Sequence, residues 1–189
     1  VSQIFSTESA FAALKEDGSV ITWGSYGGSD SSTVASSLSS GVSQIFSSLF
    51  AFAALKDDGS VITWGDSSYG GDSSTVATSL SSGVSQIFSS EPAFAALKED
   101  GSVITWGSSI HGGDSSAVAS SLASGVSQIF SSYGAFAALK DDGSVITWGL
   151  AEYGGDSSAV ASSIASGVSE IFSNRLAFAA LKDDGSVIT

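Results

Sequence analysis

The sequence predicts an all-β protein in which blade-like antiparallel sheets of three to four strands stack on one another. Three observations carry this prediction: an internal repeat of 41 or 42 residues, an Asp-Gly pair between two apolar runs in every repeat, and apolar residues on both faces of each expected sheet. Of the 189 residues, 42% are hydrophobic and 10% are aromatic, which allows a packed core and argues against disorder.

The repeat is recognised by its opening motif. Val-Ser-Gln-Ile-Phe begins at Val1, Val42, Val84 and Val126, and Val-Ser-Glu-Ile-Phe begins at Val168. Periods of this length are typical of proteins built from stacked supersecondary units. We therefore expect a single repeat domain, 1–189, composed of repeats 1–41, 42–83, 84–125 and 126–167 and a partial repeat, 168–189. The partial repeat leads us to expect a window of a longer array.

Each repeat contains three short apolar runs that predict β-strands, which in the first repeat are VSQIFS, AFAALK and SVITWG. Asp17 and Gly18 lie between the second and third runs. Because glycine accepts the positive φ of a tight hairpin, these two strands are expected to pair antiparallel. The stretch after the third run, represented by Ser115 to Gly125, fits either one or two helical turns or a short edge strand.

Strand alternation places apolar residues on both faces of each sheet. Phe11 and Ala13 share one face of the second strand, whereas Ala12 and Leu14 share the other. Such a sheet has to be covered on both faces, and the adjacent repeat is the nearest cover. A radial stack of these sheets closes into a β-propeller, whereas a linear stack forms an open β-solenoid or a superhelical repeat array. Neither end repeat carries a polar outer face, so we expect a closed ring, end-to-end joining of chains, or further repeats.

The segment Ala13–Gly24, ALKEDGSVITWG, resembles the central signature of the regulator of chromosome condensation repeat family. Val34 and Leu38, followed by VSQIFS from Val42, are similar to the segment that precedes this signature, and Tyr69-Gly70-Gly71 resembles the family's Tyr-Gly-Gln. The resemblance implies a β-propeller of short, 42-residue repeats of a bacterial type, with a four-stranded blade per repeat. Secreted bacterial members of the family bind a partner through loops on one face. The family's Gly-x-x-His-Thr is absent here, and no nucleotide-exchange residue carries over.

The composition argues against several classes of function. Six Lys and Arg against 19 Asp and Glu give a net charge of −13, so the chain has few cations to neutralise nucleic-acid phosphates. The absence of cysteine excludes disulfides and thiolate metal sites. No apolar stretch reaches the roughly 18 residues of a membrane span, so membrane insertion is not expected.

Catalysis has little support, and we expect no enzyme, cofactor or metal site. His111 is the only histidine and stands where other repeats have tyrosine, which favours a loop aromatic over a general base. The acidic pairs at the hairpins, such as Glu16-Asp17, and the Gly-Gly-Asp segments are typical of turns and solubility rather than of calcium ligands. The recurring tryptophans indicate packing between repeats more than sugar stacking.

Differences between the repeats concentrate in two loops, one between the first and second strands and one after Trp-Gly. Because successive strands run in opposite directions, both loops are expected at the same end of the sheet, away from the Asp-Gly hairpins. Loops on a rigid scaffold commonly carry recognition, and several of these side chains are of interface type. The candidate binding residues are Glu8, Ser9, Tyr26, Leu49, Phe50, Tyr69, Glu91, Pro92, Ile110, His111, Tyr133, Leu150, Glu152, Tyr153, Arg175 and Leu176.

These observations predict a non-catalytic scaffold, extracellular or at the cell surface and bacterial in type. It would recognise or adhere to a protein or glycan ligand through the variable loop face. The alternative is a structural subunit of a fibre, sheath or matrix, built by end-to-end self-association of stacked repeats. In that case the loop variation is neutral drift.

Overall fold

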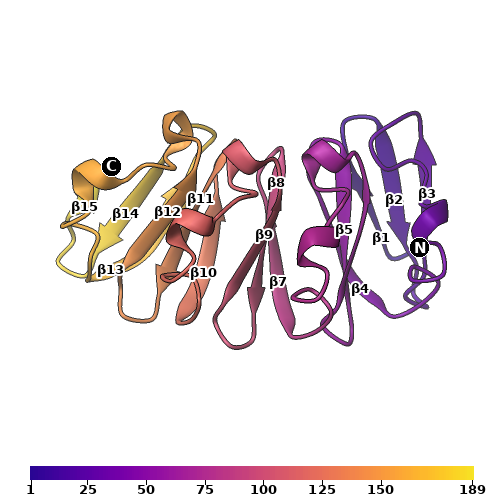
Figure 1. The fold of residues 1–189 in the computed structure, drawn as a ribbon, viewed down its shortest axis with the longest axis horizontal. Helices are drawn as coiled ribbons and strands as arrows, with labels where there is room; N and C mark the ends of the chain where they lie inside the picture. The colour runs from indigo at the N-terminus through magenta and orange to yellow at the C-terminus, as the bar shows by residue number, and fades with distance from the viewer.

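The computed structural model describes all 189 residues and is all-β, with five three-stranded antiparallel sheets. Figure 1 shows the sheets side by side in chain order, from the indigo N-terminal sheet to the yellow C-terminal one. The strands are β1 (Gln3–Ser6), β2 (Ala10–Leu14), β3 (Val20–Gly24), β4 (Val42–Ser47), β5 (Ala51–Lys56), β6 (Val61–Gly65), β7 (Val84–Ser89), β8 (Ala93–Lys98), β9 (Val103–Gly107), β10 (Val126–Ser131), β11 (Ala135–Lys140), β12 (Val145–Gly149), β13 (Val168–Ser173), β14 (Phe178–Lys182) and β15 (Val187–Ile188). The all-β prediction is confirmed, and each repeat supplies one sheet.

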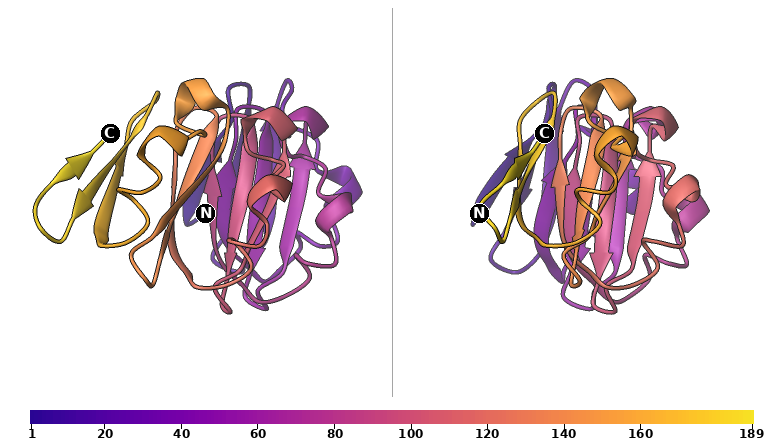
Figure 2. Two further views of the ribbon diagram at one scale, coloured as in Figure 1. Left: turned by 60° about the vertical axis from the view of Figure 1, so that its left-hand side comes forward. Right: turned by 90° about the vertical axis from the view of Figure 1, so that its left-hand side faces the viewer.

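The strand order within each sheet follows the chain, so β1, β2 and β3 are neighbours, and the same order recurs in every repeat. The first strands of successive sheets, β1, β4, β7, β10 and β13, also lie beside one another and form the inner edge of the stack. The side views in Figure 2 show each sheet facing the next along the stack. The stack is open, with the two chain ends on its opposite outer sheets.

The second and third strands of each sheet are joined by the Asp-Gly hairpin. In the first repeat, the Gly18 N–H donates to the Lys15 carbonyl at 3.0 Å, and the Lys15 N–H donates to the Ser19 carbonyl at 2.9 Å. Gly18 has a φ of 74°, and an added Cβ would lie 2.8 Å from the backbone nitrogen of Gly41. Both the left-handed backbone and this close approach therefore require glycine, as the sequence predicts.

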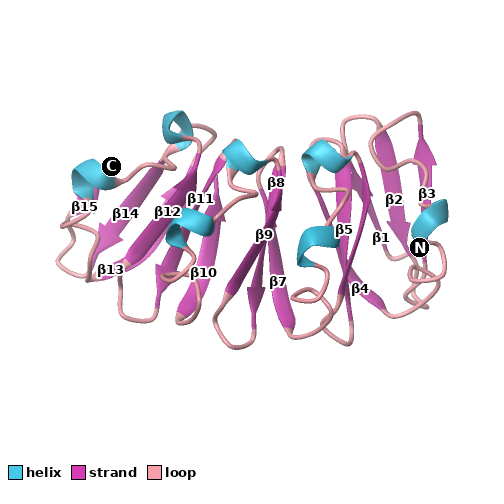
Figure 3. Cartoon of the chain, viewed as in Figure 1, coloured by secondary structure: helices cyan, strands magenta, loops and turns pink.

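Seven short 3-10 helices occupy the connections between sheets: η1 (Ser32–Val34), η2 (Ser67–Tyr69), η3 (Ser74–Val76), η4 (Ser109–His111), η5 (Ser116–Val118), η6 (Ala151–Tyr153) and η7 (Ser158–Val160) (Figure 3). The stretch from Ser115 to Gly125 therefore contains one 3-10 helical turn followed by non-helical turns. It does not form an edge strand, so each sheet has three strands and not four. Val118 and Leu122 still pack against the core, with Leu122 buried. Here the apolar spacing serves packing rather than strand pairing.

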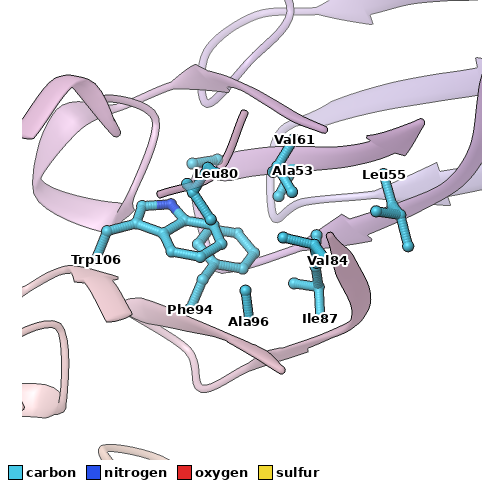
Figure 4. Packing of buried hydrophobic residues seen from close by; sticks show 10 residues of the cluster. Ala53, Leu55, Val61, Leu80, Val84, Ile87, Phe94, Ala96 and Trp106 are labelled. Carbon is cyan, nitrogen blue, oxygen red and sulfur yellow. The ribbon is translucent and has the colours of Figure 1, made fainter. Parts of the chain in front are cut away.

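The core lies between successive sheets and is asymmetric. Between the second and third repeats, Ala51 and Ala53 of β5 face Phe94 of β8 and Trp106 of β9. The Phe94 ring is stacked on the Trp106 indole, and their centroids are 5.2 Å apart. Figure 4 shows the two rings side by side in the cluster. One face of each sheet therefore presents alanine side chains, and the aromatic rings of the next sheet pack against them. This pairing confirms that neighbouring repeats cover each other's apolar faces.

The tryptophans of the inner repeats belong to these interfaces. Trp64, Trp106 and Trp148 are buried, and each indole N–H donates to a glycine carbonyl of the preceding repeat, at 3.0–3.1 Å. The structure therefore supports the packing interpretation for these three rings. Between the fourth and fifth sheets, an apolar cavity of about 190 Å³ lies beside Val145 and Phe178.

Candidate functional site

The structure brings the two variable loops of each repeat together at one end of the sheets. In the second repeat, the rings of Phe50 and Tyr69 meet edge to face at 4.9 Å, although they come from different loops. Phe50 also contacts Tyr26 of the first repeat, with ring centroids 5.4 Å apart. The Asp-Gly hairpins occupy the opposite ends of the strands. The two variable loops of each repeat therefore lie at the same end of the stack, as strand direction predicts.

The first variable residue of each repeat takes part in a main-chain ladder that crosses from sheet to sheet. The Glu8 N–H donates to the Leu49 carbonyl at 3.0 Å, and the Leu49 N–H donates to the Glu91 carbonyl at 2.7 Å. The Glu91 N–H donates to the Tyr133 carbonyl at 3.1 Å, and the Tyr133 N–H donates to the Arg175 carbonyl at 2.9 Å. We call these five residues the ladder residues. Because every bond is between backbone groups, the side chain at each position is free to vary.

The second variable residue of each repeat anchors the other loop of the same sheet. Its carbonyl accepts a hydrogen bond from the residue that follows Trp-Gly, at 2.9–3.1 Å; the carbonyls belong to Ser9, Phe50, Pro92 and Gly134, and the N–H donors are Ser25, Asp66, Ser108 and Leu150. These bonds are again independent of side-chain identity. The two most variable loops therefore rest on a repeated and fully paired backbone frame.

The ladder residues line a single groove of about 530 Å³ along the inner edge of the stack. Each repeat contributes three consecutive residues, and the lining set is Ser6, Thr7, Glu8, Ser47, Ser48, Leu49, Ser89, Ser90, Glu91, Ser131, Ser132, Tyr133, Ser173, Asn174 and Arg175. Two positions per repeat are thus polar and nearly constant, whereas the third changes from acid to aliphatic, aromatic or base. The groove combines a uniform polar wall with one variable side chain per repeat.

Charged and aromatic groups meet at the C-terminal half of this groove. The Arg175 guanidinium lies 4.8 Å from the centroid of the Tyr133 ring and 3.6 Å from the Glu91 carboxylate. The Arg175 side chain is 70% exposed and that of Glu91 is 38% exposed, so solvent screens the ion pair and it contributes little to stability. These three residues nevertheless form one contiguous group of charged and aromatic side chains at the groove.

A second tier of aromatic residues lies beside the groove near the first two repeats. The Tyr26 hydroxyl donates to the Asp66 carboxylate of the next repeat, and this hydrogen bond raises the pKa of Tyr26 and lowers the pKa of Asp66. The Asp66 carboxylate also accepts from the Ser68 N–H at 2.8 Å. Tyr26, Phe50 and Tyr69 therefore support the loop end through contacts between repeats.

His111 takes the equivalent place in the third repeat. Its Nδ1 lies 2.8 Å from the Ser108 hydroxyl, and its ring lies 6.4 Å from that of Tyr133. Tyr153 also packs against Tyr133, with ring centroids 4.8 Å apart. His111 thus forms part of an aromatic cluster, which agrees with its interpretation as a loop aromatic.

The remaining candidate residues do not line the groove. Ile110 and Leu150 border a separate surface hollow on the outside of the third and fourth repeats. Glu152 and Leu176 are exposed, Pro92 is buried, and the Ser9 hydroxyl oxygen is buried without a hydrogen-bond partner. The sixteen sequence-predicted residues therefore fall into three groups. Some line the groove, others form the aromatic contacts beside it, and the rest lie on the outer surface or are buried.

The sequence interpretation overlooked the polar residues that precede each ladder residue. The Ser48 hydroxyl donates to the Tyr69 carbonyl at 2.7 Å, and Ser132 does the same to Tyr153. In the first repeat, Thr7 donates to the Gly27 carbonyl at 3.1 Å. These hydroxyls fasten one variable loop to the other. The sequence does contain a sign of this role, because all five repeats have Ser, Thr or Asn at this position, directly before the variable ladder residue.

The opposite, hairpin end carries the acidic pairs. Asp58 accepts hydrogen bonds from the Ser60 hydroxyl at 2.6 Å and the Ser60 N–H at 2.9 Å, and these lower its pKa. Asp72 of the Gly-Gly-Asp segment likewise accepts from the Ser74 N–H. Nowhere do three His, Cys, Asp or Glu side chains converge in a way that could hold a metal ion. None of the helices is long and apolar enough to cross a membrane.

Comparison with known proteins places the fold. No family model and no curated protein sequence matches the chain. Among solved structures, Prp20p from Saccharomyces cerevisiae is 16% identical with a TM-score of 0.58, over 98% of this chain and 56% of that one. Yeast RCC1 (Prp20) in complex with Kap60 is 17% identical with a TM-score of 0.59, over 98% and 55%. The fold is RCC1-like.

A plant receptor domain shows the same likeness. The CRINKLY WD40 ectodomain of the Arabidopsis thaliana receptor kinase ACR4 is 12% identical with a TM-score of 0.55, over 98% of this chain and 66% of that one. The chain spans between half and two thirds of the length of these structures. Its five sheets therefore correspond to blades of an RCC1-like β-propeller.

Proposed function

We propose that this chain is a non-catalytic scaffold that binds a protein partner through the groove lined by the ladder residues. The observation that carries the proposal is the ladder itself. It holds Glu8, Leu49, Glu91, Tyr133 and Arg175 in one row without requiring a particular side chain at any of these positions. A fixed backbone with one variable side chain per repeat is suited to recognition by shape and charge.

The chemistry of the row favours a protein over a small molecule. Leu49 and Tyr133 supply apolar and aromatic surface, and Arg175 supplies a guanidinium that is available at the rim. Tyrosine and arginine are enriched among residues that dominate binding energy at protein interfaces. The proposal also has support from proteins of similar fold, since the Prp20p structure is described together with binding to Gsp1p and histones.

The proposal is tested with a displayed random-peptide library panned against the wild-type chain. Enriched peptides are then measured against a groove variant, Leu49→Ser with Tyr133→Ser, and against a matched control, Ile110→Ser, outside the groove. We expect the groove variant to lose at least about tenfold in affinity, the equivalent of about 1.4 kcal/mol, and the control to retain it. Both variants should remain folded, with the groove variant somewhat less stable through the lost Tyr133 ring contacts, because the ladder bonds are between backbone groups.

Two results would contradict the proposal. One is that no peptide is enriched, and the other is that enriched peptides bind the groove variant as well as they bind the wild type. A glycan array probed in parallel tests whether the groove binds a glycan instead of a protein. Groove-dependent binding of glycans without binding of peptides would replace the protein partner by a carbohydrate.

A further inference from the structure

A surface hollow of about 570 Å³ lies on the outside of the stack, between the third and fourth repeats. The third repeat contributes Ile110, Asp114 and Val118 to its lining, and the fourth contributes Leu150 and Asp156. Each of these repeats has a neighbouring repeat on both sides, and the hollow shares no lining residue with the groove. Its volume is in the range of ligand-binding clefts, about 300–1,000 Å³. The hollow is therefore a second candidate site.

The apolar part of the hollow differs from the rest of the inner surface. Ile110 is 63% exposed, and it is the only exposed large hydrophobic side chain in the second, third and fourth repeats. The equivalent positions carry Ser68 and Glu152 in the neighbouring repeats. Leu150 is half-buried in the same hollow and stands where the second repeat has Asp66. An occupant with an apolar group would remove the Ile110 and Leu150 side chains from water.

A related hollow between the first and second repeats shows what a polar pair does at these positions. Tyr26 and Ile110 each lie two residues before the glycine that packs against the phenylalanine of the next repeat, and Asp66 and Leu150 each follow Trp-Gly. The Tyr26 hydroxyl donates to the Asp66 carboxylate across this junction, and the hollow there is smaller, about 370 Å³. Ile110 and Leu150 can form no such bond, so the hollow between the third and fourth repeats keeps an apolar wall.

The acidic part of this hollow consists of Asp114 and Asp156. Each carboxylate accepts a hydrogen bond at 2.9 Å from the backbone N–H two residues later, and this bond lowers the pKa of both side chains. Both side chains are exposed. Because an ionised carboxylate offers about four lone-pair sites, the turn uses only part of its capacity. Both carboxylates can therefore accept hydrogen bonds from a bound cation.

The chain supplies no cation to balance these carboxylates. None of the residues that line the hollow is Lys, Arg or His. The five lysines all directly precede the acidic residues of the Asp-Gly hairpins, and Arg175, the only arginine, lies in the groove against the Tyr133 ring. The local field therefore attracts a positively charged group and repels anions.

We propose that the hollow binds an arginine side chain of a partner protein, together with an apolar residue next to it in the partner's sequence. The guanidinium is held by the carboxylates of Asp114 and Asp156, and the apolar neighbour packs against Ile110 and Leu150. Arginine is suited to this place because its planar guanidinium carries five donors in a geometry that matches carboxylates. A glycan would find no stacking surface, since the Trp148 ring at the hollow is only 4% exposed.

The proposal is tested with the peptide acetyl-Leu-Arg-Leu-amide, titrated into the nitrogen-15-labelled full chain while amide chemical shifts are recorded. We expect shifts confined to segments 109–118 and 147–158, with a dissociation constant on the order of 1 mM that weakens as salt is added. A counterpart with citrulline in place of arginine has nearly the same shape without the charge and should bind at least about tenfold more weakly. A Gly-Arg-Gly counterpart should also bind more weakly, because it lacks the apolar groups.

Matched variants assign the binding to the hollow. Asp114→Asn combined with Asp156→Asn removes both charges but keeps a side-chain oxygen for each turn, and it should lower the affinity by about tenfold. Asp72→Asn makes the same change in the equivalent turn of the second repeat, outside this hollow, and should bind like the wild type. Ile110→Ser should lower the affinity several-fold, whereas Leu176→Ser, at an exposed apolar side chain elsewhere, should not.

Four results would overturn the proposal. They are no shift at about ten times the expected dissociation constant, shifts that map to the ladder residues instead, equal binding of the citrulline peptide, and unchanged affinity in the Asp114→Asn, Asp156→Asn chain. Because the groove and the hollow share no lining residue, this proposal and that for the groove fail separately.

Discussion

The first and third repeats contain the same AFAALK and VITWG segments and fold into the same sheet, yet their environments differ. Phe11 pairs with Trp23 across β2 and β3, as Phe94 pairs with Trp106 across β8 and β9, and both pairs are stacked, at 5.5 and 5.2 Å. Phe94 and Trp106 are nevertheless 0% and 2% exposed, whereas their first-repeat counterparts are almost half exposed. Local sequence therefore determines the sheet, and the preceding repeat determines how much stability its aromatic face contributes.

The largest expected effect follows from this difference. Phe94→Ala removes a fully buried ring between two sheets and should lower the free energy of unfolding by about 3–5 kcal/mol. Phe11→Ala removes the same ring where it is 44% exposed in this structure, and the loss should be below about 1 kcal/mol for this chain. Urea unfolding of both variants, at concentrations where the chain is monomeric, checks the comparison. Equal losses would show that stability does not come from the neighbouring repeat.

The glycines give a second matched pair. Gly70 has a φ of 92°, and a Cβ there would lie 2.6 Å from the ring of Phe94 in the next repeat. Gly185 has a φ of 82°, but a Cβ there would meet nothing within 4 Å. Gly185→Ala should therefore cost only the left-handed backbone strain, about 1–2 kcal/mol. Gly70→Ala adds displacement of a packed ring, for a total of about 2–5 kcal/mol. Similar denaturant midpoints for the two variants would contradict this account.

Much of the repeat unit could be predicted because its determinants are local. The Asp17-Gly18 pair determines a hairpin through the glycine backbone, and two-faced apolar alternation in AFAALK requires a cover on each side. Strand direction then places both variable loops at one end. The connecting segment could not be assigned from sequence because the spacing of Val118 and Leu122 fits either a turn or an edge strand. In the structure it is a 3-10 turn, with Leu122 buried and Val118 partly buried against the core.

The groove could not be predicted at the same level. The ladder joins residues such as Glu8 and Leu49 through backbone groups, which leave no trace in side-chain patterns. Variation alone therefore grouped Ile110 with Tyr133, although only Tyr133 lines the groove. The separation depends on how far each loop reaches over the neighbouring sheet, and this is a property of the stack rather than of one repeat.

The tryptophan hydrogen bond gives a smaller and more specific difference between inner and outer repeats. The Trp106 indole N–H donates to the buried Gly70 carbonyl at 3.1 Å, whereas the Trp23 side chain is 43% exposed in this structure. Trp106→Phe should lower the free energy of unfolding by about 1–3 kcal/mol, because a buried carbonyl loses its donor. Trp23→Phe should leave the unfolding midpoint nearly unchanged. A similar loss at both positions would assign the effect to ring size instead.

The hairpin carboxylates should show no difference between the repeats, since their partners are local. The Ser19 hydroxyl and N–H lower the pKa of Asp17, and Ser102 does the same for Asp100, although one hairpin belongs to the first repeat and the other to the third. A carboxylate whose pKa is lower in the folded state adds stability above its ordinary pKa of 3.8, and this is lost as pH falls through the folded value. Carboxyl-carbon NMR titration should therefore give equal depressions, and Ser19→Ala and Ser102→Ala should raise the two pKa values equally. A larger shift in the third repeat would mean that the neighbouring sheets act on the turns as well as on the core, and that even this part of the repeat is not set by local sequence.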